Sequence, residues 1–382
     1  MYELDYCASA IAFRPALGPQ TTKGFGQGGF ALPRYDPGNG EDVSKGFLHY
    51  LKERYRDVFL RFGEGLVYIP NGWETHTYAF RLKTVDCLPS ELRGPLVVRI
   101  YSSTQGLPRA RHEFEVQQHL VKRGFPAPFP KFLEEDCSLF GGPFLVMEQV
   151  QGWTLVEFLS RTPLWLWPTA YQMALTQIRL HQLPTRNFPA PSESLLDRRL
   201  EEIQGLLEEY NLAGLAPGLG WLKEHRPPEP DKPSILHLDY HPLNLMRRPD
   251  GAMAVLDWPE ADIGDSHADF ATTLMLMDCC PVGDNSPFSQ VMLPIGRSLL
   301  RMWYSYEYKK RMRVDEQRLG YYKGLAALRR LAGYGRWLNA SPLSTGCKPS
   351  SIRYLCPHHL KVMQAYFRKN TGVGVNLIRE PR

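Results

Sequence analysis

The spacing of hydrophobic and polar positions changes near residue 150 of the chain. Before that point, turn residues separate short β-rich runs: "GLVYIP" (65–70), "HTYAFRL" (76–82), "GPLVVRIY" (94–101) and "GPFLVMEQVQG" (142–152). Apolar residues near helical spacing occupy 42–62 and again 107–123, where Gly124 and Pro126 mark the helix end. Residues 45–150 are therefore predicted to form a small sheet carrying a helix.

After residue 151 the pattern is mainly helical. Helical runs cover 154–161, 168–184, 195–210, 268–278, 292–314 and 317–338, and strand-like runs interrupt them at 234–271. Residues 14–41 are rich in Gly and Pro and show no periodicity. The predicted organisation is an irregular arm over 1–44, an N-terminal lobe over 45–150 and a mainly helical C-terminal lobe over 151–382.

Composition excludes several classes of function. The net charge of +5 is small for 382 residues and argues against a dedicated nucleic-acid-binding protein. No stretch approaches the roughly 18 consecutive apolar residues of a membrane helix, so no membrane association is predicted. Seven cysteines, an odd number without a C-x-x-C pair, indicate reduced thiols and a cytoplasmic location. The oligomeric state is left open.

The segment 234–271, "SILHLDYHPLNLMRRPDGAMAVLDWPEADIGDSHADFA", carries more charge than a buried strand pair needs. It holds seven acidic side chains, three histidines and one asparagine. Pro249-Asp250-Gly251 predicts a hairpin turn, which places Asn244 opposite Val255 and about two positions from Asp257. Asn244 and Asp257 would then supply two hard oxygen ligands at one hairpin end, as a phosphate-bound Mg²⁺ requires.

The residues before the hairpin have the spacing of a phosphotransferase catalytic loop, H-x-D-x-x-x-x-N. His237, Asp239 and Asn244 occupy its three positions. In such a loop the aspartate takes the proton of the acceptor hydroxyl and the asparagine holds the metal. Asp239 is therefore the candidate base, with Asn244 and Asp257 as metal ligands. His237 is expected to order this catalytic loop by hydrogen bonding.

The complete motif resembles that of the aminoglycoside phosphotransferase / choline kinase family of small-molecule kinases. The family pattern is approximately H-G-D-x-x-x-x-N followed by I-D-[FW]-x-x-x-x-x-G-D-P-x-x-D-[LF]-A. Leu238 stands where the family usually has glycine, and Ser266 where it has proline. The resemblance implies a bilobal protein-kinase-like α+β fold. Its parts are an N-terminal antiparallel sheet with a helix and a mainly helical C-terminal lobe with a catalytic-loop hairpin.

The same resemblance assigns roles in the N-terminal lobe. Gly72 lies in the hairpin expected to cover the phosphates of ATP. Arg99 stands at the position of the basic residue that contacts those phosphates, where many relatives have lysine, and Glu113 is its expected ion-pair partner. Adenine is expected to bind backbone groups of the hinge formed by Glu148, Gln149 and Val150.

The resemblance implies ATP- and Mg²⁺-dependent phosphorylation of a hydroxyl group on a small molecule, either an antibiotic or an amino-alcohol or sugar metabolite. Two alternatives remain open. One is a catalytically silent nucleotide-binding protein of the same fold. The other is a protein kinase, which the absence of D-F-G and A-P-E segments disfavours. Glu260, Asp262 and Asp265 follow the metal carboxylate closely and predict a negative cleft mouth, hence a neutral or cationic acceptor.

Overall fold

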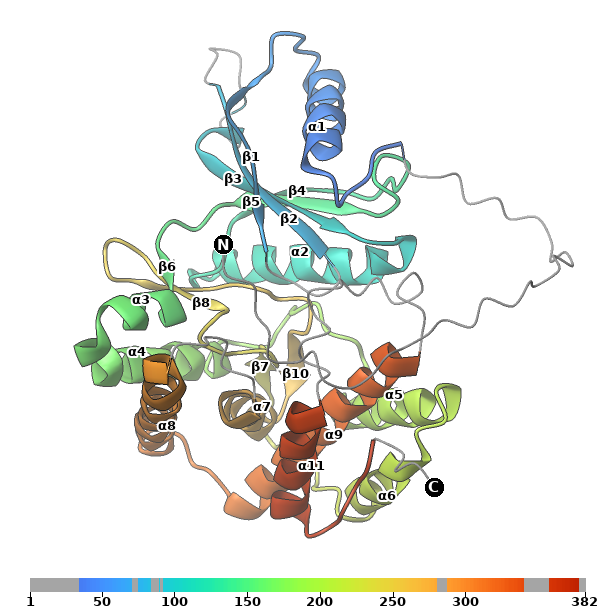
Figure 1. Ribbon diagram of the computed structural model, residues 1–382, viewed down its shortest axis with the longest axis vertical. Coiled ribbons are helices and arrows are strands. Elements are labelled where there is room, and N and C mark those ends of the chain that lie inside the picture. The colour runs from blue at the N-terminus through green and yellow to red at the C-terminus, as the bar shows by residue number, and fades with distance from the viewer. Residues whose placement is uncertain are drawn as a thin grey trace, which may run out of the picture.

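The computed structural model describes residues 34–70, 75–83, 89, 92–279, 287–339 and 357–377. It divides into a sheet-containing N-terminal part and a mainly helical C-terminal part, stacked along the long axis of the molecule (Figure 1). The predicted α+β class, with the sheet in the N-terminal half, is confirmed. Gly72 lies outside the described residues.

The N-terminal sheet has five strands in the order β1-β2-β3-β5-β4, all antiparallel. Its strands are β1 (Phe62–Ile69), β2 (Thr75–Leu82), β3 (Pro95–Tyr101), β4 (Pro130–Glu134) and β5 (Phe144–Glu148). Helix α1 (Gly40–Tyr55) precedes the sheet. A short 3₁₀ turn η2 (Thr104–Gly106) leads from β3 into helix α2 (Leu107–Lys122).

Side-chain alternation along the strands decides which helix each face contacts. On β3, Val98 packs with α1 residues such as Phe47, whereas Val97 packs with Phe114 of α2 on the opposite face. Successive strand residues point to opposite faces, so Arg99 shares the face of Val97. The period of the strand therefore directs Arg99 toward α2.

The first helix is shorter than the predicted 42–62. It ends at Tyr55 because Arg56 adopts a left-handed conformation with φ of 52°. The backbone N–H of Asp57 then donates to Lys52 O at 3.1 Å, a bond that closes the helix end. Phe59, expected on the buried face, is 80% exposed. The predicted helix therefore ran too far, because the helical spacing of apolar residues continues across the turn that leads into β1.

The hinge after β5 is held by backbone contacts. The N–H of Glu148 donates to Phe129 O at 2.9 Å, and the N–H of Gln149 donates to Pro95 O at 3.0 Å. Gly152 follows with φ of 135°, and a Cβ at this position would lie 2.1 Å from Arg247 O. Glycine is therefore required where the chain crosses from the sheet to the C-terminal part.

The C-terminal part is built mainly from helices around one hydrophobic core. Its helices are α3 (Leu155–Arg161), α4 (Leu166–His181), α5 (Leu195–Glu209), α6 (Ala216–Glu224), α7 (Ser266–Cys279), α8 (Pro287–Lys309), α9 (Glu316–Asn339) and α11 (Pro357–Thr371), with 3₁₀ turns η3 (Pro163–Trp165) and η4 (Ala213–Leu215). Helix α7 is buried on most sides, and its Phe270 stacks on Tyr308 of α8 with ring centroids 4.1 Å apart. Within the described ranges, no helix is both long and apolar enough to cross a membrane.

Five short strands in the described C-terminal part carry the candidate catalytic loop. β6 (Trp153–Thr154), β8 (Leu245–Arg247) and β9 (Met253–Val255) form one antiparallel sheet, and β7 (Ser234–Leu236) pairs with β10 (Asp262–Gly264). The predicted 249–251 turn joins β8 to β9. The register differs by one residue from the prediction, because Leu245 lies opposite Val255. Asn244 consequently meets Leu256, whose N–H donates to Asn244 O at 2.8 Å.

Candidate active site

The catalytic loop 237–244 is anchored by the buried carboxylate of Asp269 on α7. This carboxylate accepts the backbone N–H of His237 at 3.1 Å and that of Leu238 at 2.7 Å. It also contacts His181 Nε2 at 3.0 Å. Burial by itself would raise the pKa of Asp269, but the hydrogen bond and charge of His181 outweigh it and lower the pKa. Asp269 is therefore an ionised anchor of the loop.

Replacing Asp269 by alanine is expected to destabilise the protein by about 3–5 kcal/mol, because it leaves buried donors without their carboxylate. Urea unfolding of Asp269→Ala against the wild type measures this loss. Asp250→Ala serves as the matched control, since Asp250 accepts an exposed turn N–H, that of Ala252. Equal unfolding midpoints for Asp269→Ala and the wild type would refute the anchoring role.

His237 is fully buried and orders the loop through backbone contacts. Its Nδ1 accepts the N–H of Asp239 at 3.2 Å, and its Nε2 lies 2.8 Å from Leu256 O. One ring nitrogen thus accepts and the other donates, which joins the loop to the end of the hairpin. This geometry supports a positioning role for His237.

Leu238 adopts a left-handed conformation with φ of 61°. This conformation costs an L-residue roughly 1–2 kcal/mol and costs glycine little. The backbone at this position therefore has the shape for which the family's usual glycine is suited. The Leu238 side chain, which glycine would lack, lines the cleft.

Asp239 lies at the centre of the candidate site. Its Oδ2 accepts from Asn244 Nδ2 at 3.0 Å, and its Oδ1 accepts from Arg330 Nη2 at 3.1 Å. His241 Nε2 is 3.5 Å from the same carboxylate. Burial would raise the pKa of Asp239, but the charges of His241 and Arg330 hold it well below its usual range. The carboxylate is thus ionised, as a proton acceptor must be.

Arg99 connects the N-terminal sheet to Asp257. Its Nη1 lies 2.6 Å from Glu113 Oε1 and 2.8 Å from Asp257 Oδ1. Burial would lower the pKa of Arg99, but the charges of Asp257 and Glu113 raise it well above its usual value. Glu113 is fully buried and also accepts from the Tyr101 hydroxyl at 2.5 Å. The structure therefore brings Arg99, the phosphate candidate, together with its expected partner Glu113 and with the metal candidate Asp257.

Asp257 is turned out of the hairpin by its own backbone. Strand β9 ends at Val255, and Asp257 has φ of 66° in the left-handed region. Its carboxylate contacts Arg99 on the wall of a cleft of about 700 Å³. Asp239, Arg99 and Asp257 all line this cleft, whereas the hinge residues Glu148, Gln149 and Val150 are not among its lining residues.

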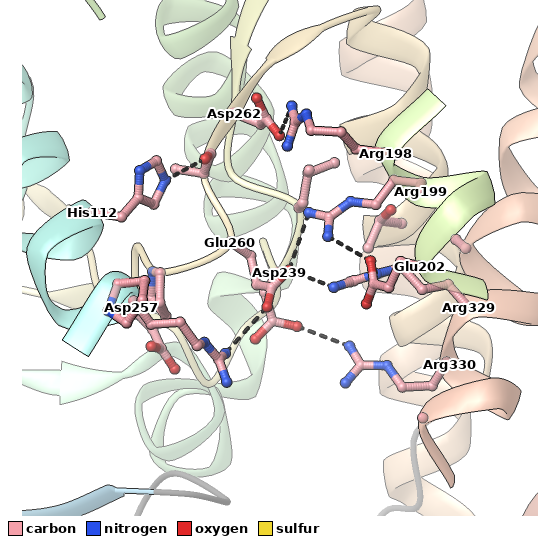
Figure 2. A pocket seen from close by; sticks show the side chains of 18 of the residues that line it. His112, Arg198, Arg199, Glu202, Asp239, Asp257, Glu260, Asp262, Arg329 and Arg330 are labelled. Atoms are coloured by element: carbon pink, nitrogen blue, oxygen red, sulfur yellow. Dashed lines mark hydrogen bonds and ion pairs between the residues drawn. The ribbon is translucent and has the colours of Figure 1, made fainter. Parts of the chain in front are cut away.

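The structure corrects the expected negative potential at the cleft mouth. Glu260 is paired with Arg329 at 2.7 Å and with Arg199 at 3.2 Å. Asp262 is paired with Arg198 at 2.6 Å, and Figure 2 shows this pair at the edge of the pocket. These arginines neutralise carboxylates for which the sequence indicated no partner.

Asp265 lies outside the lining of the cleft and is paired as well. It contacts Arg318 at 2.6 Å and caps the start of α7 by accepting the N–H of His267 at 3.0 Å. Against the effect of burial, hydrogen bonds from His267 and Arg318 lower the pKa of Asp265 to about 2. Its role in the structure is that of a helix cap and ion-pair partner.

The sequence analysis missed a group of arginines in the site, which come from two helices far apart in the chain. Arg198 and Arg199 come from α5, and Arg329 and Arg330 come from α9 (Figure 2). The signal that could have found them is the Arg-Arg doublet in "LLDRRLEE" and again in "ALRRLAG". Each doublet lies within a predicted helix and was given no role in the sequence analysis.

Curated relatives of this chain include members of the acyl-CoA dehydrogenase family. Acyl-CoA dehydrogenase family member 11 of Gallus gallus is 27% identical over 221 residues, which cover 48% of this chain and 28% of the relative. Acyl-CoA dehydrogenase family member 10 of Mus musculus is 28% identical over 193 residues, covering 46% and 18%. The chain thus spans less than a third of the length of these curated relatives.

Two solved structures with the same fold are an aminoglycoside phosphotransferase and an amicoumacin kinase. The aminoglycoside phosphotransferase APH(4)-Ia, in a ternary complex with ADP and hygromycin B, has a TM-score of 0.58 at 15% identity, covering 85% of this chain and 99% of that one. Amicoumacin kinase hAmiN, in complex with AMP-PNP, Ca²⁺ and Ami, has a TM-score of 0.54 at 14% identity, covering 87% and 96%. The protein-kinase-like fold is confirmed. The model of the phosphotransferase enzyme family matches residues 66–286, more than half of the chain, and the chain belongs to that family.

Proposed function

We propose that this chain transfers the γ-phosphoryl group of ATP to a hydroxyl group of a small molecule. The observation that carries the proposal is the arrangement of Asp239, Asp257 and Arg99 around one cleft, with Asp239 ionised and bonded to Asn244. Membership of the phosphotransferase enzyme family supports the reaction type. The solved neighbours, which hold ADP or AMP-PNP with an antibiotic, support ATP as the donor.

In the proposed reaction, the acceptor oxygen attacks the γ-phosphorus. The bond between that phosphorus and the β–γ bridging oxygen breaks, and its electron pair leaves with ADP. The hydroxyl proton passes to the carboxylate of Asp239. Catalysis of this kind rests on positioning and on neutralisation of charge more than on covalent chemistry.

The residues at the hairpin end fit a Mg²⁺ ion. Asn244 uses its amide nitrogen to bind Asp239, which orients its amide oxygen, a hard ligand. Asp257 supplies a carboxylate from two residues beyond β9, the other strand of the same hairpin. Mg²⁺ commonly takes one or two protein oxygens and completes its shell with phosphates and water, so Asn244 and Asp257 suffice. When bound, the ion neutralises charge on the transferred phosphoryl group.

Arg99 and the hinge would hold the nucleotide. Arg99 is fixed by buried Glu113, so its guanidinium is pre-positioned for the ATP phosphates. The N–H groups of Glu148 and Gln149 already bond within the sheet. We therefore assign adenine recognition to the neighbouring Val150 N–H and to backbone carbonyls of the hinge.

A catalytically silent nucleotide-binding protein is the second candidate, and one observation favours it. Arg99 Nη1 is 2.8 Å from Asp257 Oδ1, an oxygen that a metal ion would use. A permanent Arg99–Asp257 pair would hold the metal carboxylate away from Mg²⁺. An active kinase must exchange this contact for ATP phosphates and metal.

Addition of ATP with Mg²⁺ is expected to raise the melting temperature. A ligand at 100 times its Kd stabilises the folded state by about 2.7 kcal/mol, and ATP without Mg²⁺ should stabilise it less. Differential scanning fluorimetry measures both shifts, with Mg²⁺ alone as the control. The absence of any shift with ATP and Mg²⁺ would contradict the proposed function. A shift without ATP consumption across aminoglycosides, macrolides, sugars and amino alcohols would favour the silent protein.

A further inference from the structure

All the carboxylates that line the cleft are already paired with arginine. Seven arginines and five carboxylates contribute to the described lining. Glu202 pairs with Arg199 and Arg329, and the pairs of the other four carboxylates are described above. A cationic acceptor would have to displace a guanidinium group to reach any of them.

The pairs on the acceptor side form a fixed frame. Arg329 of α9 contacts Glu202 at 2.9 Å and Glu260 at 2.7 Å, and Arg199 of α5 contacts the same two carboxylates. Two arginines and two glutamates thus close a ring that joins α5, α9 and the loop before β10. Arg109 of α2 adds a contact with Glu260 at 3.2 Å. The ring fixes the helix that carries the next residue, Arg330.

Arg330 lies where the acceptor hydroxyl must arrive. Its Nη2 is 3.1 Å from Asp239 Oδ1, and its side chain is 28% exposed (Figure 2). An acceptor that bonds Asp239 through its hydroxyl therefore places its adjacent atoms beside this guanidinium. An anionic group on those atoms would bind Arg330 and leave Asp239 to the hydroxyl.

Space for such a group lies along the same helix face. Ala326, Arg330, Gly333 and Trp337 follow one another at spacings of three or four, and all line the cleft. Among the described residues, and apart from its chain neighbours and its own helix backbone, no atom lies within 4 Å of a Cβ built at Gly333. Arg336, three residues beyond Gly333, lines the cleft as well. The space over Gly333, between Arg330 and Arg336, is therefore open to an anionic group of the acceptor.

We propose that the acceptor carries an anionic group, a carboxylate or phosphate close to the phosphorylated hydroxyl, and that Arg330 binds it over Gly333. The proposal rests on the proposed function, since it concerns the acceptor side of the same site. It reverses the neutral or cationic acceptor expected from the sequence. Arg330 is a specificity-determining residue in this assignment, and Gly333 provides the room.

Four probes with one carbon skeleton test the charge preference. Glycerate and glycerol 3-phosphate are anionic, glycerol is neutral, and 3-amino-1,2-propanediol is cationic. Each is added at equal concentration and constant ionic strength to the protein saturated with ADP and Mg²⁺, and the further shift in melting temperature is measured. At least one anion is expected to give the largest shift, and the two anions separate carboxylate from phosphate recognition. Equal shifts, no shift with either anion, or the largest shift with the amine overturns the proposal.

Variants of Arg330 test whether the preference for an anionic acceptor depends on this face of α9. Arg330→Gln is expected to weaken binding of the anion roughly 10- to 100-fold, the effect of losing a hydrogen bond to a charged group, and to retain the ADP–Mg²⁺ shift. Arg368→Gln, at an exposed position of α11, is the matched control. If Arg330→Gln weakens ADP–Mg²⁺ binding and leaves the anion preference unchanged, Arg330 serves the nucleotide and the proposal fails.

Gly333 offers an independent test that does not remove a charge. Gly333→Ala should fold well, because alanine favours a helix over glycine by about 1 kcal/mol and the Cβ meets open space. Gly333→Leu should fill the subsite and abolish the anion shift, with the ADP–Mg²⁺ shift retained. An unchanged anion shift in Gly333→Leu would place the anion elsewhere. If ADP with Mg²⁺ gives no shift in the melting temperature of the wild type, the proposed function itself is refuted.

Discussion

Asp239→Asn is expected to retain ATP binding in the presence of Mg²⁺ and to lose phosphoryl transfer. A positioned general base contributes about 10²–10⁴ in rate, and loss of hydroxyl orientation adds to that. The amide keeps the shape of the carboxylate but cannot take the proton. The measurement is kcat, together with ATP affinity and melting temperature, in one preparation of the variant.

The alternative for Asp239 is a purely structural role in the loop, because it bonds Asn244 and Arg330. That role predicts a lower melting temperature, with activity falling only in proportion to unfolded protein. Asp250→Asn, in the exposed hairpin turn, is the matched control for the substitution itself. A kcat near the wild-type value in Asp239→Asn would remove this residue from the mechanism.

Asp257→Ala is expected to abolish the tightening of ATP binding by Mg²⁺. Loss of a partner in the outer shell already costs about 10–100-fold in metal affinity, and a direct ligand should cost more. Arg99 keeps Glu113 as a partner at 2.6 Å, so the N-terminal contacts of ATP should survive. Calorimetric titration of ATP with and without Mg²⁺ measures the effect.

Asp257→Asn separates charge from ligand geometry in the same titration, because the amide keeps one oxygen for the metal. It is expected to retain part of the Mg²⁺ effect. If the wild type binds ATP equally well with and without Mg²⁺, Asp257 is not a metal ligand. The Arg99–Asp257 contact would then stand as a permanent ion pair, in agreement with the silent protein.

The grouping of the candidate catalytic residues could be predicted because these residues are close in the sequence. Asp239 and Asn244 are five positions apart in one loop, and the hairpin turn brings Asp257 back beside them. The pairing of Arg99 with Glu113 was expected from the family resemblance, and the two side chains lie 2.6 Å apart. The predicted element boundaries were wrong where the pattern of apolar residues continues past a point at which the backbone conformation changes. The left-handed Arg56 ends α1 early, and the hairpin register is offset by one residue.

The sign of charge available to the acceptor was decided by tertiary structure alone. Asp262 lies 64 residues from its partner Arg198, and Glu260 lies 69 residues from Arg329. In the sequence these carboxylates stand beside the metal-binding motif with no cation near them, which led to a negative cleft. Folding packs α5 and α9 against that loop and pairs each carboxylate with a guanidinium. Coulombic interaction depends on distance in space, and the spacing of charges along the chain does not report that distance between separate helices.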